Sequence, residues 1–169
     1  LGELAVTRQA HPIPTGHLLA NFRQRVGLVK ATVRGEDGRV AAPWPIPISA
    51  SPGDTLHLTL KWEALAKAEE SYTIFVHLID QANQPYVALD YTPLGGASPT
   101  HLWFPKWLPG QQFTDPYRLQ IPPDLPPGTY LIEVGMYEMV SLRRLHISDA
   151  DGNLVGDRFI LGQVEVLAP

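Results

Sequence analysis

The stretch that decides the fold is Pro-Pro-Asp-Leu-Pro-Pro-Gly-Thr-Tyr, residues 122–130. Its four prolines fix the backbone φ angle and remove amide donors, so neither a helix nor a central strand can run through its first six residues. The stretch therefore predicts a tight corner. From Tyr130 to Met136 every second side chain is apolar, which predicts a strand that starts directly after the corner.

Tyr130 is predicted to hold this corner in place. A tyrosine at the start of a strand after such a turn is typical of the tyrosine corner of immunoglobulin-like sandwiches, in which the hydroxyl group bonds back to the upstream backbone. We expect the hydroxyl of Tyr130 to bond to the backbone within Asp124–Pro127. Tyr130 is therefore interpreted as a structural residue.

Apolar residues elsewhere also recur with the period of a strand. Thr55–Trp62 alternates strictly between apolar and polar residues, which predicts a strand with one buried face. Tyr72–Ile79 is apolar on both parities, which predicts a central strand covered on both sides. The remaining strands are predicted at Val26–Val33, Tyr86–Tyr91, Phe113–Ile121, Arg143–Ile147 and Arg158–Leu167.

No segment predicts a long helix. Ala64–Glu70 has good helix propensity but spans barely two turns, so it is interpreted as a connection with a helical turn. Seven to nine short strands without a helix of three turns predict an all-β fold, a two-sheet immunoglobulin-like β-sandwich with long proline-rich loops.

The length of 169 residues suits one domain. Residues 1–20 show no sustained periodicity and are predicted to be an extended arm or linker, with one edge strand near Glu3–Thr7, while residues 21–169 form the single sandwich domain. The 17 Pro and 14 Gly fall between the apolar runs, where turns are expected. Ala42–Ile48 holds three of these prolines, so it is predicted to be a covering loop or an edge crossing.

The composition excludes several classes of protein. A formal net charge of −4 and the lack of a Lys/Arg run argue against a nucleic-acid partner. Without cysteine there is no disulfide, thiolate metal site or cysteine nucleophile. No apolar run reaches the roughly 18–20 residues of a membrane-spanning helix. Because the chain starts at Leu1 without a signal-peptide pattern, we expect a fragment whose parent protein can carry a membrane part upstream.

The acidic residues near the end of the chain resemble a calcium loop only in part. Asp149, Asp151 and Asn153 alternate as in such a loop. The sixth position, however, is Leu154 instead of Gly, and the twelfth is Ile160 instead of Glu. A simple turn between strands is the favoured interpretation.

The residues of a catalytic or metal site do not occur in a recognisable pattern. The six histidines show no metal-ligand spacing, and His77, inside the predicted central strand, is expected to be a buried, hydrogen-bonded imidazole. No Gly-x-Ser-x-Gly elbow is present. We therefore predict no catalytic residue, no metal ligand and no cofactor, and we interpret the chain as not an enzyme.

Aromatic side chains on irregular segments form the candidate binding site. Aromatic faces stack on sugar rings and anchor protein interfaces, but they also plug the open ends of a sandwich. Both interpretations remain open from the residues alone. The candidate residues are Trp44, Tyr91, Trp103, Phe104 and Trp107.

Six short phrases carry a family resemblance. They are Ala-Asn-Phe (20–22), Ser-Pro-Gly-Asp-Thr-Leu-x-Leu-x-Leu-x-Trp (51–62), Tyr-Thr-Ile-Phe-Val-His-Leu-Ile-Asp (72–80), Pro-Thr-x-Leu-Trp (99–103), Leu-Pro-Pro-Gly-Thr-Tyr (125–130) and Leu-Gly-Gln-Val-x-Val (161–166). Because these phrases occur in this order, the chain resembles the β-sandwich domain appended C-terminally to multi-pass bacterial membrane glycosyltransferase-like proteins of the dolichol-phosphate-mannose-using type. It departs from that pattern in the proline-rich segment 42–48 and in the extra residues 104–108.

The resemblance implies a non-catalytic, extracytoplasmic accessory module of a membrane-anchored parent protein, with catalysis in a membrane domain outside this chain. It implies no particular binding residue. Two functions remain open: the module binds a glycan through its loop aromatics, or it is a structural or protein-interaction domain that packs on its membrane glycosyltransferase or on another copy of itself.

Overall fold

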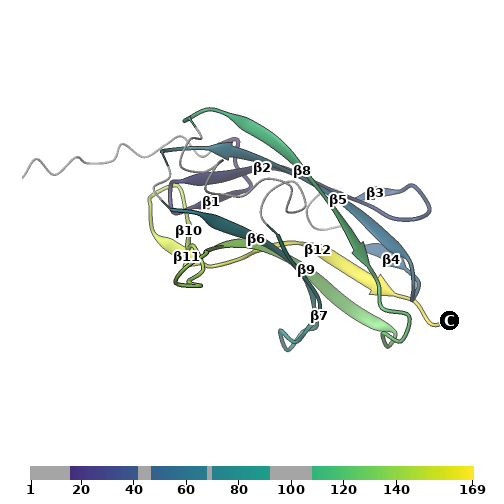
Figure 1. The fold of residues 1–169 in the computed structure, drawn as a ribbon. Helices are drawn as coiled ribbons and strands as arrows, with labels where there is room; N and C mark the ends of the chain where they lie inside the picture. Colours follow the sequence, from purple (N-terminus) through teal and green to yellow (C-terminus); the bar gives the residue numbers. More distant parts are fainter. Residues whose placement is uncertain (1–15, 42–46, 68–69, 92–107) are drawn as a thin grey trace, which may run out of the picture.

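The fold is seen in a computed structural model that describes residues 16–41, 47–67, 70–91 and 108–169 (Figure 1). Two β-sheets pack face to face, and none of the described residues is helical. The all-β, two-sheet immunoglobulin-like sandwich predicted from the sequence is confirmed. No helix that could cross a membrane occurs among the described residues.

The described residues form twelve strands in the two sheets. Sheet A contains β1 (Ala20–Phe22), β2 (Val26–Arg34), β3 (Val40–Ala41), β5 (Thr55–Ala64), β8 (Gln112–Gln120), β10 (Ile147–Ser148) and β11 (Leu154–Gly156). Sheet B contains β4 (Ile48–Ala50), β6 (Tyr72–Ile79), β7 (Pro85–Tyr91), β9 (Gly128–Glu138) and β12 (Phe159–Val166). Only β2, β5, β6, β7, β8, β9 and β12 exceed three residues, and each matches a predicted strand to within three residues at either end.

The strand order interleaves distant parts of the chain. Sheet A runs β11-β10-β1-β2-β5-β8, with β3 also paired to β2, and sheet B runs β4-β12-β9-β6-β7. All pairs are antiparallel except β4 with β12, which run parallel. Between β3 and β4 the chain passes from sheet A to sheet B, which fits the edge crossing predicted for the proline-rich stretch, although residues 42–46 themselves lie outside the described residues.

The core lies between the sheets and is built from one face of each long strand. On β5 the side chains of Leu56, Leu58 and Leu60 are fully buried, and each such burial contributes roughly 1.5–3 kcal/mol. Trp62 continues the same face and meets Phe22 edge to face at 5.8 Å between ring centroids. β6 is buried on both faces, as its double apolar parity predicted.

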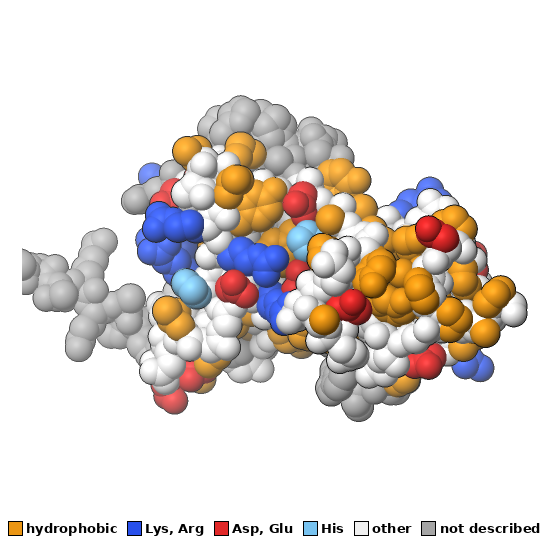
Figure 2. All heavy atoms as spheres, turned by 90° about the horizontal axis from the view of Figure 1, so that it is seen from below, with side chains coloured by type: hydrophobic (Ala, Val, Ile, Leu, Met, Phe, Trp, Pro, Cys, Tyr) orange, Lys and Arg blue, Asp and Glu red, His pale blue; other side chains and the backbone are white. Residues whose placement is uncertain are grey.

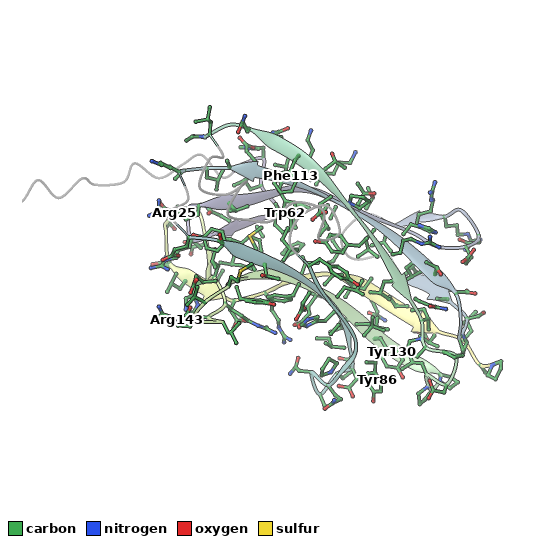
Figure 3. The ribbon with its side chains drawn as sticks, viewed as in Figure 1. Arg25, Trp62, Tyr86, Phe113, Tyr130 and Arg143 are labelled. Atoms are coloured by element: carbon green, nitrogen blue, oxygen red, sulfur yellow. The ribbon has the colours of Figure 1, made fainter. Side chains whose placement is uncertain are left out.

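The tyrosine corner is present as predicted. The hydroxyl of Tyr130 donates a hydrogen bond of 2.8 Å to the carbonyl of Pro126, and the ring is buried. Tyr86 of β7 meets this ring edge-on at 5.5 Å between centroids, and Figure 3 shows the two tyrosines side by side. The corner therefore fixes the entry of the chain into the centre of sheet B.

The strand predicted at Arg143–Ile147 is wrong. Arg144 makes only an isolated bridge to Tyr137 at the end of β9, and Ile147 already pairs with Phe22 in sheet A. This segment crosses from one sheet to the other, so it cannot run as a strand within either.

The helical turn expected within Ala64–Glu70 is also wrong for the residues that the structure describes. Ala64 ends β5 and lies in the strand. The backbone amides of Leu65 and Ala66 donate to the carbonyl of Arg25, at 2.9 and 3.4 Å, so they bond to the β1–β2 turn and not along a helix. The predicted arm spans residues 1–20, and the structure describes its last five: the amide of Leu19 donates to the carbonyl of Leu28 at 2.7 Å, and Ala20 begins β1. Residues 1–15, with the edge strand predicted near Glu3–Thr7, fall outside the described residues and stay a prediction.

Replacing Tyr130 by Phe is expected to destabilise the domain by about 1–2 kcal/mol, because the substitution removes the partly buried hydrogen bond to the Pro126 carbonyl. Urea unfolding of both proteins measures this difference. Tyr86→Phe is the control. The Tyr86 side chain is exposed and its hydroxyl makes a long hydrogen bond of 3.4 Å to the Asp80 carboxylate, so its loss should cost little. Equal losses in the two variants would contradict the role of the corner.

Candidate functional site

The outer face of sheet B carries an ion-pair network centred on Glu133 of β9. The Glu133 carboxylate is only 3% exposed. It lies 2.9 Å from Nδ1 of His77, its partner in register on β6, and accepts a hydrogen bond of 2.7 Å from Nη1 of Arg158. Nη2 of Arg144 lies 3.5 Å away. A carboxylate this buried requires such partners, because an unpaired buried charge is strongly destabilising.

His77 joins this network to Asp90 on β7. Its Nε2 lies 2.7 Å from Oδ1 of Asp90, while Nδ1 faces Glu133. Because ionised carboxylates only accept hydrogen bonds, this geometry favours an imidazolium that donates from both nitrogens. Burial lowers the pKa of His77, but the hydrogen bonds and charges of the two carboxylates outweigh burial and raise it.

The ionisation of Glu133 follows from the same contacts. Burial by itself raises the pKa of this carboxyl, but the hydrogen bonds from His77 and Arg158 and the charge of Arg144 lower it to about 2. Glu133 is therefore ionised at neutral pH. His77 is hydrogen-bonded as predicted, but its side chain is 13% exposed and therefore only partly buried.

Phe75 lies beside His77 on the same outer face and is only 1% exposed. Its ring rests on the backbone of Gly135, the residue opposite in register, where a Cβ atom would approach the ring to 2.3 Å. The Arg144 guanidinium covers the ring from above at 4.3 Å from its centroid, a cation–π contact. Arg144 thus holds both the aromatic ring and the carboxylate of Glu133.

A shallow, open groove of about 200 Å³ runs over this face. It is lined by Phe75, His77, Asp90, Tyr137, Leu142 and Arg144. Figure 2 looks onto this side of the molecule and shows basic, acidic and apolar side chains close together. The groove thus combines a donor-only guanidinium with an acceptor-only carboxylate beside aromatic and aliphatic carbon.

A second exposed feature lies at one end of the sandwich, which we call the basic end (residues 23–25, 65–67, 70–71 and 139–146). Backbone hydrogen bonds join its segments: Arg23 N to His146 O at 2.8 Å, Leu65 N to Arg25 O at 2.9 Å and Met139 N to Ser71 O at 3.0 Å. Figure 3 shows Arg25 and Arg143 at this same end.

Residues 139–142 form the tip of the basic end. The side chain of Val140 is 90% exposed and that of Leu142 is 68% exposed. The Glu138 carboxylate accepts hydrogen bonds from the amides of Val140 (2.8 Å) and Ser141 (2.7 Å), which hold the turn in one conformation. A hydrogen bond from the Ser141 side chain, together with these amide hydrogen bonds, lowers the pKa of Glu138. The tip thus presents aliphatic side chains to solvent from a constrained loop.

Of the aromatic residues predicted to bind a ligand, the structure describes Tyr91. It ends β7, is 42% exposed, and its ring stacks on Tyr117 of β8 at 6.4 Å between centroids. This contact spans the two sheets at their open flank, away from the groove lining. The others, Trp44, Trp103, Phe104 and Trp107, lie outside the described residues, so their role remains a prediction.

The turn interpretation of Asp149–Asn153 is confirmed. Oδ1 of Asp149 accepts hydrogen bonds from the amides of Asp151 (3.0 Å) and Asn153 (2.8 Å), and Oδ2 accepts one from the Asn153 side chain (3.1 Å). Both carboxylate oxygens thus close the turn itself. Within the described parts of the chain, no group of three or more His, Asp or Glu side chains could hold a metal ion.

Sequence reasoning did not find Asp90, Glu133, Arg144 and Arg158 as members of one cluster. The available signal was a His or Glu in the interior of each of two apolar strands, His77 and Glu133. That pattern indicates a paired site, but the pairing depends on strand register, which the sequence does not show.

Comparisons with known proteins found similarity at the level of structure only. No family model matches the chain, and no curated protein matches it. Among solved structures, the chain is similar to a Niemann-Pick type C2 protein from the Japanese carpenter ant, with 10% sequence identity and a TM-score of 0.36. That match covers 69% of this chain and 79% of the other. It carries no inference about function.

The free energy of unfolding is expected to fall on both sides of a pH plateau. Glu133 has a pKa of about 2 in the folded state against an ordinary value of 4.5, so its contribution is full above pH 4.5 and is lost as the pH falls toward 2. The pKa of His77 is raised above 6.5, so its contribution is full below pH 6.5 and is lost as the pH rises through the folded-state pKa.

Urea titrations over a pH series measure the free energy of unfolding on the acid side of the plateau (the acid limb) and on the alkaline side (the alkaline limb). His77→Gln is expected to remove most of the loss on the alkaline side, because the variant has no imidazolium to deprotonate. An alkaline limb of unchanged size in this variant would show that His77 does not link the network to pH.

Gly135→Ala is expected to destabilise the domain by about 1–3 kcal/mol, because the added methyl group would overlap the Phe75 ring beneath Arg144. Chemical denaturation gives the difference. Gly162→Ala in β12 is the matched control, because nothing lies within 4 Å of a Cβ atom placed there. A stability equal to that of the control would mean that the ring is not confined.

Proposed function

We propose that the domain is a non-catalytic, extracytoplasmic accessory module that binds a glycan in the groove on the outer face of sheet B. The observation that carries the proposal is the lining of the groove, in which Asp90 and Arg144 stand beside Tyr137 and Leu142. Ligand sites in proteins combine apolar surface with a few fixed polar groups in this way.

The charges of the groove select the class of ligand. Asp90 would repel an anionic ligand and Arg144 a cationic one. A sugar is neutral, and each of its hydroxyl groups both donates and accepts, so it can satisfy Asp90 and Arg144 together. The Tyr137 ring and the Leu142 side chain offer apolar surface to the carbon face of a sugar ring.

The polar groups of the groove are already held in place. Asp90 is bonded to His77, and Arg144 is fixed between Glu133 and the Phe75 ring. Side chains ordered before binding lose less entropy when a ligand arrives, which favours useful affinity from few contacts.

The ionisation of the network favours binding over hydrolysis of a glycosidic bond. Glycosidases use a carboxylic acid whose raised pKa keeps it protonated as the general acid. The pKa of Glu133 is instead lowered to about 2, and its oxygens are occupied by His77 and Arg158. This supports a non-catalytic role for the cluster.

The extracytoplasmic location and the attachment to a membrane glycosyltransferase-like parent rest on the sequence resemblance alone. In that setting the module would hold a glycan near a catalytic domain outside this chain. The predicted loop aromatics, Trp44, Trp103, Phe104 and Trp107, would contribute rings that stack on the sugar.

The alternative function, packing on the parent or on another copy of the chain, is favoured by the exposed apolar side chains of the tip.

A glycan-array screen of the chain followed by calorimetry tests the proposal. Asp90→Asn is expected to weaken binding about tenfold or more, because it removes a charged acceptor from the site. Asp124→Asn, an exposed aspartate at the corner, is the matched control and should bind as the wild type. Trp107→Ala in the same assay measures the contribution of the loop aromatics.

Unfolding curves of each variant separate lost binding from lost folding, since Asp90 also contacts His77. A wild-type chain that binds no glycan on the array would refute the proposed function. Equal affinity of Asp90→Asn and the wild type would place the site elsewhere on the molecule.

A further inference from the structure

Charge is unevenly distributed between the basic end and the rest of the chain. The described residues of the basic end, together with Glu138, whose carboxylate closes the tip, contain five Lys and Arg and two Glu, in a chain with a net charge of −4. Within the described residues, Arg23 and Arg143 form no ion pair, and both are exposed. The basic end is therefore a positive surface on an acidic protein.

Backbone strain is concentrated at the same end. Among the described residues, four non-glycine residues have positive φ angles, and three of them are Arg23 (53°), Gln24 (56°) and Leu142 (59°). The β1–β2 turn uses Arg-Gln where Asn-Gly would be far more favourable, and an exposed leucine in the left-handed region is uncommon. Neither choice favours stability, and retained strain of this kind points to a function of the exposed side chains.

The tip also has a shape that restricts its partners. Val140 and Leu142 project from a turn that Glu138 holds rigid, so the apolar surface is convex. A rigid partner would need a matching apolar pocket ringed by acidic groups. A lipid bilayer needs no such pocket, since it deforms around apolar side chains and presents anionic headgroups at its surface.

We propose that the basic end docks on the surface of an anionic lipid bilayer, with Val140 and Leu142 in the interfacial region and Arg23 and Arg143 at the lipid phosphates. This goes beyond the proposed glycan binding and does not depend on it. The aliphatic side chains supply apolar burial and the arginines supply electrostatic attraction, and peripheral membrane binding generally combines the two. Leu142 also lines one edge of the groove, so a docked tip covers that edge, and the two proposed sites share this side chain.

Sedimentation of the 169-residue chain with phosphatidylcholine vesicles, with and without phosphatidylglycerol, tests the proposal. Binding is expected only to the anionic vesicles and should weaken as salt is added. Leu142→Asn is expected to weaken binding about tenfold, the scale of one leucine side chain left in water. The variant should fold as well as the wild type or better, because asparagine tolerates the left-handed conformation.

Two further variants complete the test. Arg143→Gln is expected to weaken binding to anionic vesicles about fivefold. Leu167→Asn is the matched control: Leu167 is also exposed, but it lies near the C-terminus at the opposite end of the sandwich (Figure 1), so this variant should bind as the wild type.

The proposal is overturned if the wild type does not bind anionic vesicles, if it binds neutral vesicles equally well, or if Leu142→Asn binds unchanged. A dimer in sedimentation velocity that Leu142→Asn dissociates would assign the tip to self-association and also refute the proposal. Asp90→Asn should keep full vesicle binding, so a failure of the glycan site and a failure of membrane docking are distinguishable.

Discussion

The burial of one carboxylate, that of Glu133, organises the outer face of sheet B. An ionised group in the middle of a sheet, nearly removed from water, is tolerated only when its oxygens are hydrogen-bonded and its charge is balanced. His77, Arg158 and Arg144 meet this requirement from three different segments of the chain. The register of β6 on β9, the start of β12 and the path of the crossing after the tip are all tied to this one charge.

The aromatic and ionic parts of this face depend on each other. Arg144 can cover Phe75 only because the ring lies flat on the sheet, and the ring lies flat only because residue 135 has no side chain. The same guanidinium approaches Glu133, so packing and charge balance share one side chain. Energies of such shared contacts are not additive, and a double-mutant cycle is needed to separate them.

The long strands and the corner were predictable from the sequence because their signals are local. Period-two alternation located β5, and the proline-rich turn located Tyr130 and its hydrogen bond. The crossing at Arg143–Ile147 was not predictable, because its short apolar pattern is the same whether the chain stays in one sheet or changes sheets. The candidate site was missed for a related reason: Asp90 and Glu133 come together only through strand register, which no local pattern encodes.

The parallel pairing of β4 with β12 has a consequence for how the domain is made. β12 is the last of the described strands in chain order and lies between β4 and β9, so Ile48 finds its partner Val164 only after all the residues between them have been synthesised. Until then one edge of β9, the central strand of sheet B, has no neighbour and can pair with another nascent chain. Such long-range pairings also slow folding. Completion of the sandwich thus waits for β12, and loss of this strand would separate β4 from the rest of sheet B.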